Sequence, residues 1–140
     1  MPENVNATLT WIDGMRFVGR ADSGHGVLFD VKSRPDHLAP TPIETFLMSI
    51  AGCTGMDVVA ILGKMRQPVE QLEIGVTGVR AETNPKYYTA IELTYRLRGK
   101  GLDRDKVERA VALSHSTYCS ASASLRPDCK VTHRIEISES

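Results

Sequence analysis

The feature that most constrains the fold is a long apolar run between two prolines, Pro42 and Pro68. Its start carries helix signals, since Thr41 can act as the N-cap and Glu44, three residues later, completes a capping box. Apolar residues then recur at helical spacing through FLMSIAGCTGMDVVAIL until the second proline stops the run. The sequence therefore predicts one long helix, apolar around most of its circumference, which belongs in a core or between subunits.

Short alternating segments on both sides of this helix predict strands. Before it, ATLTWI and MRFVGR flank Asp13-Gly14, a dipeptide that favours a two-residue hairpin turn, and VLFDVK follows as a third strand. After it, two alternating runs predict a long hairpin, residues 72–82 and 87–99. In the second run one face is apolar and the other faces solvent. The apolar face is formed by Ile91, Leu93, Tyr95 and Leu97, and the solvent face by Glu92, Thr94, Arg96 and Arg98.

The rest of the chain predicts a second helix and a last strand. Residues 102–116 have helical spacing, with Asp103 as the cap. One side of this helix is formed by Val107, Ala110, Val111 and Ser114. The small-residue run CSASAS follows, and KVTHRIEI closes the chain as a strand. The order of elements predicts an α+β fold in which one sheet packs on two helices.

The length and charge of the chain narrow the class of partner. At 140 residues it fits one domain, residues 1–140. Lys plus Arg and Asp plus Glu both number 17, so nothing favours nucleic acid or an anionic membrane. No apolar run approaches the roughly 18 residues of a membrane span, and MPENVNATLTWIDG lacks the features of a signal peptide. We therefore expect a cytoplasmic protein that binds a small molecule or another protein, with no nucleic acid and no membrane as partner.

Three cysteines without a CxxC pair indicate neither a disulfide scaffold nor a structural zinc site. The four histidines are scattered, so we expect no metal and no cofactor. Cys53 lies within the apolar helix between Gly52 and Gly55, which either allow close packing around a buried thiol or open space for a substrate. Cys119 follows the second helix among serines and alanines, where a thiol can be accessible. Cys129 has no such surroundings and is interpreted as incidental.

The stretches PIETFLMSIAGCTGMDVVAIL and AVALSHSTYCSASASL, separated by a hairpin and a helix, resemble the OsmC/Ohr family of thiol-dependent peroxidases, with the YhfA-like branch as the nearest match. The resemblance implies an OsmC-like fold, with an antiparallel sheet packed on two central helices in an intertwined homodimer. It also implies that Cys53 attacks an organic hydroperoxide and becomes a sulfenic acid. Cys119 then resolves this species as a disulfide, which a dithiol reductant, often a lipoyl protein, reduces. This activity would protect the cell against oxidative stress.

The same resemblance implies two further site residues. In the family a glutamate ten residues before the first cysteine and an N-terminal arginine position the thiolate. Arg16 is the best match to the arginine, with Arg20 second. Residue 43 is Ile here, and the glutamate is Glu44, a slip that turns the side chain by about 100° around a helix and leaves the capping box as its local role.

Two other functions stay open on the residues alone. One is a dimeric module that binds a small apolar ligand, with structural thiols and no peroxidase activity. The other is a thiol-disulfide exchanger acting on proteins, which the missing CxxC disfavours. Reaction of Cys53 and Cys119 with hydroperoxide separates the peroxidase from the binding module.

Overall fold

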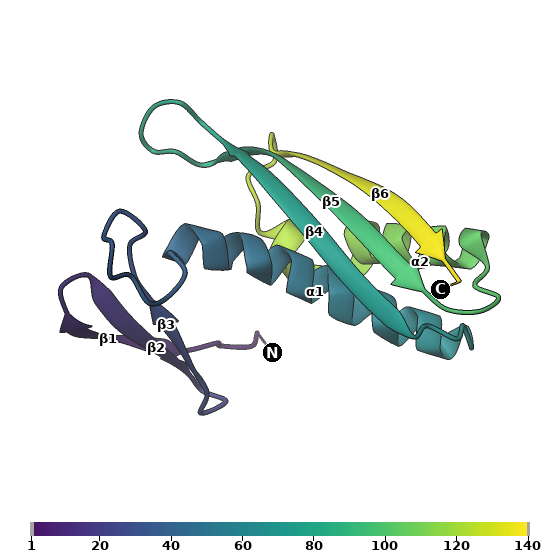
Figure 1. Ribbon diagram of the computed structural model, residues 1–140, viewed down its shortest axis with the longest axis horizontal. Helices are drawn as coiled ribbons and strands as arrows, with labels where there is room; N and C mark the ends of the chain where they lie inside the picture. Colours follow the sequence, from purple (N-terminus) through teal and green to yellow (C-terminus); the bar gives the residue numbers. More distant parts are fainter. Residues whose placement is uncertain (1, 140) are drawn as a thin grey trace. The chain divides into compact units, whose positions relative to one another are not determined.

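The computed structural model describes residues 2–139, which form two compact units, one ending at Phe46 and one beginning at Leu47 (Figure 1). The first unit holds an antiparallel sheet in the order β1-β2-β3, with the bounds Ala7–Asp13, Arg16–Ala21 and Gly26–Phe29. The predicted hairpin is present, but its two turn residues are Gly14 and Met15, one residue later than Asp13-Gly14, because Asp13 still pairs with Arg16. Gly14 has a φ of +48°, a backbone conformation that favours glycine. The prediction that residues 1–140 form one domain stays a prediction.

The second unit holds a second sheet, in the order β4-β5-β6, with helices on it. The strands are Gln71–Arg80, Tyr88–Arg98 and Lys130–Ser138. The long helix α1 has the bounds Pro42–Lys64, and α2 spans Arg104–Leu113. A π-helical turn η1, Ser114–Tyr118, and the short α3, Ser120–Ala123, follow α2. The α+β class is confirmed, although the strands form two sheets and not the single one expected.

The second sheet is mixed, which corrects the prediction of an antiparallel sheet. Strands β4 and β5 form the expected antiparallel hairpin, with Leu72 opposite Leu97 and Val76 opposite Leu93. Strand β6 pairs parallel to β5. Parallel neighbours need a crossover connection, and the segment that contains α2, η1 and α3 supplies it.

The core of the second unit lies between this sheet and the helices. The apolar face of β5 is buried as predicted, with Ile91, Leu93, Tyr95 and Leu97 all at most 2% exposed. The predicted face of α2 is buried too: Val107, Ala110, Val111 and Ser114 have no exposed surface. Helix α1 contributes residues four apart, which are Ile50, Thr54, Val58 and Leu62.

The structure contradicts one expected wet position. Thr94 on β5 is 5% exposed, because Arg134 on the neighbouring β6 reaches over it and donates to its Oγ1 at 3.4 Å. The long stem of an arginine can cover a neighbouring side chain while its head stays near water. The alternating pattern gave no sign of this cross-strand neighbour.

Helix α1 is more apolar than the sequence analysis allowed. Its 23 residues include an 18-residue window of mean hydropathy 1.8, so by length and composition it is long and apolar enough to cross a membrane. The expectation that no run approaches a membrane span was therefore wrong. One such helix is weak evidence, because core helices of soluble proteins pass the same test. Part of its surface is exposed, including Met48, Met56 and Val59.

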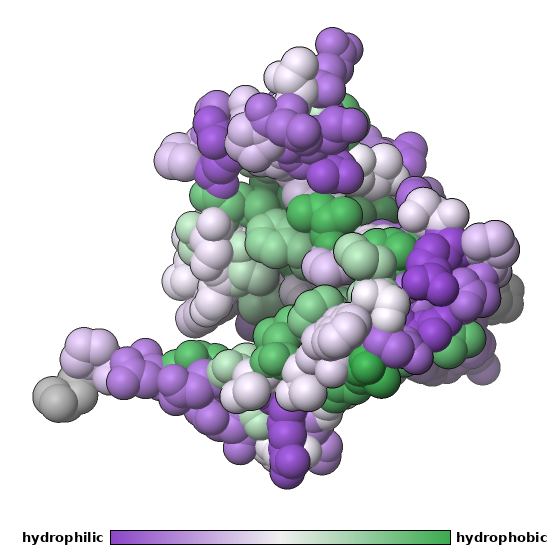
Figure 2. All heavy atoms as spheres, turned by 90° about the vertical axis from the view of Figure 1, so that its left-hand side faces the viewer, coloured by the Kyte–Doolittle hydropathy of each residue, from purple (hydrophilic) through white to green (hydrophobic). Residues whose placement is uncertain are grey.

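The first sheet also exposes large apolar side chains. Leu9, Trp11 and Ile12 on β1 and Val18 on β2 are all more than one third exposed. Figure 2 shows apolar surface beside hydrophilic surface on the face that it displays.

Candidate active site: two thiols and a carboxylate

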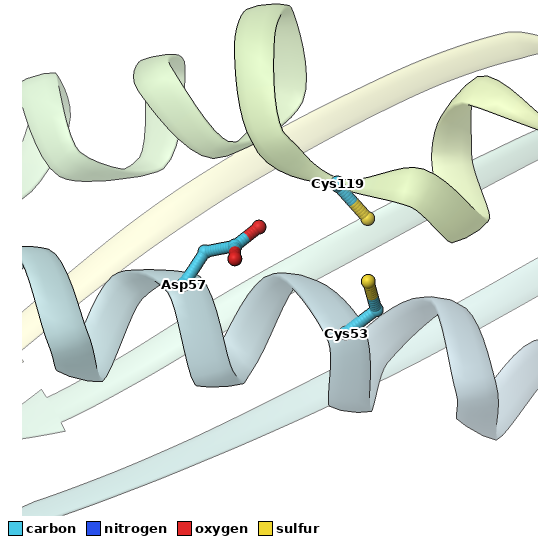
Figure 3. Close-up of side chains that lie close together, drawn as sticks. All are labelled: Cys53, Asp57 and Cys119. Carbon is cyan, nitrogen blue, oxygen red and sulfur yellow. The ribbon is translucent and has the colours of Figure 1, made fainter. Parts of the chain in front are cut away.

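The structure brings Cys53 and Cys119 together, although they are far apart in sequence. Cys53 lies on α1, and Cys119 lies between η1 and α3. The two Sγ atoms and a carboxylate oxygen of Asp57 all lie within 4.8 Å of one another. Figure 3 shows the two sulfurs pointing toward each other, with the carboxylate beside them. All three cysteines of the chain are reduced in this structure.

The π-helical turn η1 sets the position of Cys119. Its N–H donates to the carbonyl of Ser114 at 2.8 Å, five residues back, and this bond closes the wide turn. Cys119 then caps α3, and its Sγ accepts from the N–H of Ser122 at 3.4 Å. Isolated π-helical turns are rare and occur frequently at functional sites. The turn therefore ends α2 with a thiol aimed at α1.

Burial decides the protonation of Cys119. The side chain is 4% exposed, and this burial raises the pKa of its thiol. The hydrogen bond from the Ser122 N–H acts in the opposite direction, while the neighbouring Cys53 raises the pKa further. Cys119 is therefore a protonated thiol at neutral pH, and it needs a base before it can act as a nucleophile.

Asp57 was missed by the sequence analysis, although a signal was present. It lies four residues after Cys53 on a helix, so the two side chains share a face. Its Oδ2 accepts a hydrogen bond from Ser114 Oγ at 2.8 Å. A charged residue in the middle of an apolar helix face, one turn from a candidate nucleophile, could have been singled out.

A chain of hydrogen bonds runs inward from this carboxylate. Ser114 Oγ lies 2.7 Å from Thr54 Oγ1, which lies 2.9 Å from the hydroxyl of Tyr95. The Tyr95 hydroxyl lies 2.7 Å from Nε2 of His115. Burial is the largest of the effects that raise the pKa of Tyr95, to about 12, and it lowers the pKa of His115, so both side chains are neutral at pH 7. His115 is half-buried and belongs to this chain of hydrogen bonds.

Arg16, the candidate activator of Cys53, lies in the first unit. Its guanidinium pairs with Asp30 at 3.0 Å, Asp13 at 3.3 Å and Asp36 at 3.4 Å. The hydrogen bond to Asp30, which is 1% exposed, is the largest effect that raises the pKa of Arg16. In the other direction, the Leu38 N–H is the largest effect that lowers the pKa of Asp30. Within the first unit, Arg16 thus serves to hold the segment after β3.

Glu44 forms the capping box that the sequence predicts. Its Oε1 accepts from the Thr41 N–H at 2.9 Å, and its own N–H donates to Thr41 Oγ1 at 3.2 Å. The hydrogen bond from the Thr41 N–H is the main effect that lowers the pKa of Glu44. Arg20, the second candidate, lies on β2 opposite Thr8. The catalytic roles assigned to Arg16, Glu44 and the two cysteines stay predictions.

The two glycines around Cys53 differ. A Cβ at Gly55 would come within 2.9 Å of Ile74 Cδ1 on β4, so this glycine allows the helix to approach the sheet. A Cβ at Gly52 would meet no heavy atom within 4 Å among the described residues. Close packing therefore explains Gly55, and open space lies beside Gly52.

The donor set suits redox chemistry better than a metal. Among residues 2–139, Cys53, Asp57 and Cys119 are the group whose donor atoms lie close enough to share a cation. Two thiols and one carboxylate match none of the common structural or catalytic zinc sets, which have four ligands or include histidine. Two facing thiols are instead the arrangement that a reversible disulfide requires.

Comparisons with known proteins place the chain in a family. The model of the family described as OsmC-like protein matches residues 35–134. Protein YhfA of Escherichia coli K12 is 38% identical over 133 residues, 95% of this chain and 98% of that one. A crystal structure of a hypothetical protein from Aquifex aeolicus is 31% identical, with a TM-score of 0.83, covering 99% of this chain and 100% of that one. The organic hydroperoxide resistance protein OhrB of Bacillus subtilis is 17% identical, with a TM-score of 0.67 over 96% and 98%, and so shares the fold.

Proposed function

Because the chain belongs to the OsmC-like family, we propose that it is a thiol-dependent peroxidase that reduces organic hydroperoxides and protects against oxidative stress. The observation that carries the proposal is the approach of Cys53 Sγ to Cys119 Sγ within 4.8 Å. Relatives of the same fold are described as organic hydroperoxide resistance proteins, which supports the substrate class.

The first step oxidises Cys53. Its thiolate attacks an oxygen of the hydroperoxide, the O–O bond breaks, and the alcohol leaves after taking up a proton. The sulfur becomes a sulfenic acid and has lost two electrons. Cys53 is the more exposed of the two thiols, which suits the one that meets the substrate.

The second step closes a disulfide. The Cys119 sulfur attacks the sulfenic sulfur, the S–O bond breaks, and water leaves. Two thiols of a dithiol reductant, by chemistry a dihydrolipoyl group on a protein, then reduce the disulfide by two exchange reactions. The segment that carries Cys119 is a short helical turn, and it needs to move by a small distance for an S–S bond to form.

The proposal includes the roles predicted for Arg16 and Glu44 in stabilising the Cys53 thiolate. Arg16 is already shared among three carboxylates of the first unit, and Glu44 is engaged by Thr41. Arg16→Ala should slow the reaction of Cys53 with hydroperoxide if that role holds. An unchanged rate would mean that Arg16 has only its structural contacts, and Glu44→Gln tests Glu44 in the same way.

The proposal also includes a cytoplasmic homodimer without nucleic acid or membrane as partner. Exposed apolar residues on α1 and on the first sheet, such as Met56 and Trp11, need a covering surface, and a second copy supplies one. Three cysteines without a CxxC pair favour a reducing compartment. Sedimentation equilibrium should give twice the mass of the chain, and a monomer at micromolar concentration would contradict this part.

A second candidate function rests on a separate observation. The first unit contains an apolar cavity of about 300 Å³, lined by Leu9, Met15, Phe17, Phe29, Asp30, Val31 and Pro42. A cavity of this size and lining can hold a small apolar ligand. The chain would then be a binding module with structural thiols. Such a protein should gain thermal stability with the ligand while Cys53 stays reduced in hydroperoxide.

The deciding experiment is intact-mass analysis of the reduced protein after one equivalent of cumene hydroperoxide, followed by peptide mapping. The peroxidase should lose two hydrogens, with the bond mapped to Cys53 and Cys119. Cys53→Ser should abolish consumption of the hydroperoxide, and Cys129→Ser is the matched control. No mass change in the wild type would refute the peroxidase and leave the binding module.

A further inference from the structure

We propose that Asp57 carries the proton in the step that closes the disulfide. It accepts the proton of the Cys119 thiol as that sulfur attacks the oxidised Cys53, and it delivers the proton to the hydroxyl group that leaves. This inference rests on the proposed peroxidase function and adds a catalytic residue to it.

The chemistry of the step calls for such a group. Cys119–SH and Cys53–SOH become one disulfide and one water, so a proton leaves one sulfur while the hydroxyl bound to the other gains one. A single base that faces both sulfurs can do both. An oxygen of Asp57 lies within 4.8 Å of each Sγ. The oxygen that Cys53 gains on oxidation, or one water molecule, spans the rest of that distance.

The charge of Asp57 fits this step better than the first one. The first step starts from the Cys53 thiolate, which has no proton for a base to accept. After oxidation Cys53 is a sulfenic acid, and the proton to be moved is the one on Cys119. Cys119 is then the group that needs help, since it is buried and protonated.

The hydrogen bond from Ser114 holds the Asp57 carboxylate in place and leaves it able to accept further hydrogen bonds. A carboxylate has two oxygens and about four lone-pair sites, and Ser114 Oγ uses one site on Oδ2. Ser114 has no exposed surface, so the donor itself is immobilised in the core. The carboxylate is therefore held beside the sulfurs with acceptor capacity left.

The hydrogen bond from Ser114 to Asp57 determines which group is the donor in each of the hydrogen bonds that link Ser114, Thr54, Tyr95 and His115. Ser114 spends its one proton on Asp57, so it accepts from Thr54, and Thr54 in turn accepts from Tyr95. Tyr95 then accepts from Nε2 of His115, which is therefore the protonated ring nitrogen. Each donor in this chain points along it toward Asp57, and the carboxylate at its end therefore starts the step as an acceptor.

The test separates the two chemical steps in the wild type and in Asp57→Asn. After one equivalent of cumene hydroperoxide, rapid quenching with dimedone traps Cys53 sulfenic acid, and intact mass follows the disulfide. Asp57→Asn should form the sulfenic acid no more slowly than the wild type and close the disulfide at least about tenfold more slowly, a threshold set below the roughly hundredfold lower bound of what proton transfer contributes. With excess hydroperoxide it should accumulate sulfinic acid at Cys53. Asp105→Asn, which removes an exposed carboxylate of α2, is the matched control.

Chemical rescue distinguishes a proton carrier from a structural residue. Added formate should restore disulfide closure in Asp57→Ala, because a free carboxylate replaces the missing one. Ser114→Ala should slow closure less than Asp57→Asn, and formate should not help it. Closure by Asp57→Asn within about twofold of the wild type, or a slow Asp57→Ala that formate does not rescue, would overturn the inference. If neither Asp57 variant folds, an unchanged closure rate in Ser114→Ala overturns it. A wild type whose Cys53 never oxidises would instead refute the peroxidase function.

Discussion

Replacing Thr54 by valine should lower the free energy of unfolding by about 2 kcal/mol, without leaving a cavity. The Thr54 hydroxyl links Tyr95 and Ser114 at 2.9 and 2.7 Å, and none of the three side chains has exposed surface. Valine has nearly the same shape but cannot accept the Tyr95 proton. This buried O–H donor is then left without its partner, which is the expensive way to break a hydrogen bond.

Tyr95→Phe is the matched comparison and should cost about 1 kcal/mol. It frees the N–H of His115, which is half-buried and can reach water, and it leaves Thr54 still donating to Ser114. The double variant should cost less than the sum of the two single ones, because it removes the orphaned donor. Urea unfolding at one protein concentration measures all three, with a midpoint shift of about 1 M expected for Thr54→Val. The reasoning would be refuted if Thr54→Val lowered the free energy of unfolding by less than Tyr95→Phe does, or if the effects of the two substitutions were strictly additive.

Three more predictions concern Tyr95, Gly78 and Cys129. In an ultraviolet absorbance titration one tyrosine should ionise near pH 12, and this transition should be missing from Tyr95→Phe. Because the pKa of Tyr95 is higher in the folded than in the unfolded chain, neutral Tyr95 contributes stability below the pKa of an unfolded tyrosine. This contribution is lost as the pH rises toward 12. Titration of all four tyrosines together would contradict this. Gly78→Ala should destabilise by about 1–3 kcal/mol in thermal unfolding, because its Cβ would overlap the ring of Tyr88, and an unchanged melting temperature would show that the ring moves freely. Cys129→Ser should close the disulfide at the wild-type rate, because Cys129 lies outside the group of Cys53, Asp57 and Cys119. Loss of the disulfide in this variant would make Cys129 part of the site.

Local signals predicted the elements of this fold well. Thr41 and Glu44 are three residues apart, and their reciprocal capping bonds depend on nothing else. The alternation along β5 likewise follows from a strand with one buried face. The parallel pairing of β6 left no such trace, because it depends on how a long crossover closes and not on any residue pattern within the strand.

The candidate site was predictable in part for the same reason. The two cysteines stood out by their small neighbours, and Asp57 could have been read from its spacing to Cys53. The bonds among Thr54, Tyr95 and Ser114 join three elements that meet in the folded chain alone. Their residue types are ordinary for a helix or strand, so no local pattern distinguishes them.

The parallel placement of β6 also governs when the thiol pair comes into existence. The hairpin of β4 and β5 joins neighbours in the chain and can form early, whereas β6 docks after a long loop has closed. Cys119 lies within that loop, so its distance from Cys53 becomes short late in folding. Before this point nothing in the chain selects Cys119 over Cys129 as the neighbour of Cys53. A disulfide between Cys53 and Cys119, if the proposed peroxidase forms one, would therefore report that the crossover has closed.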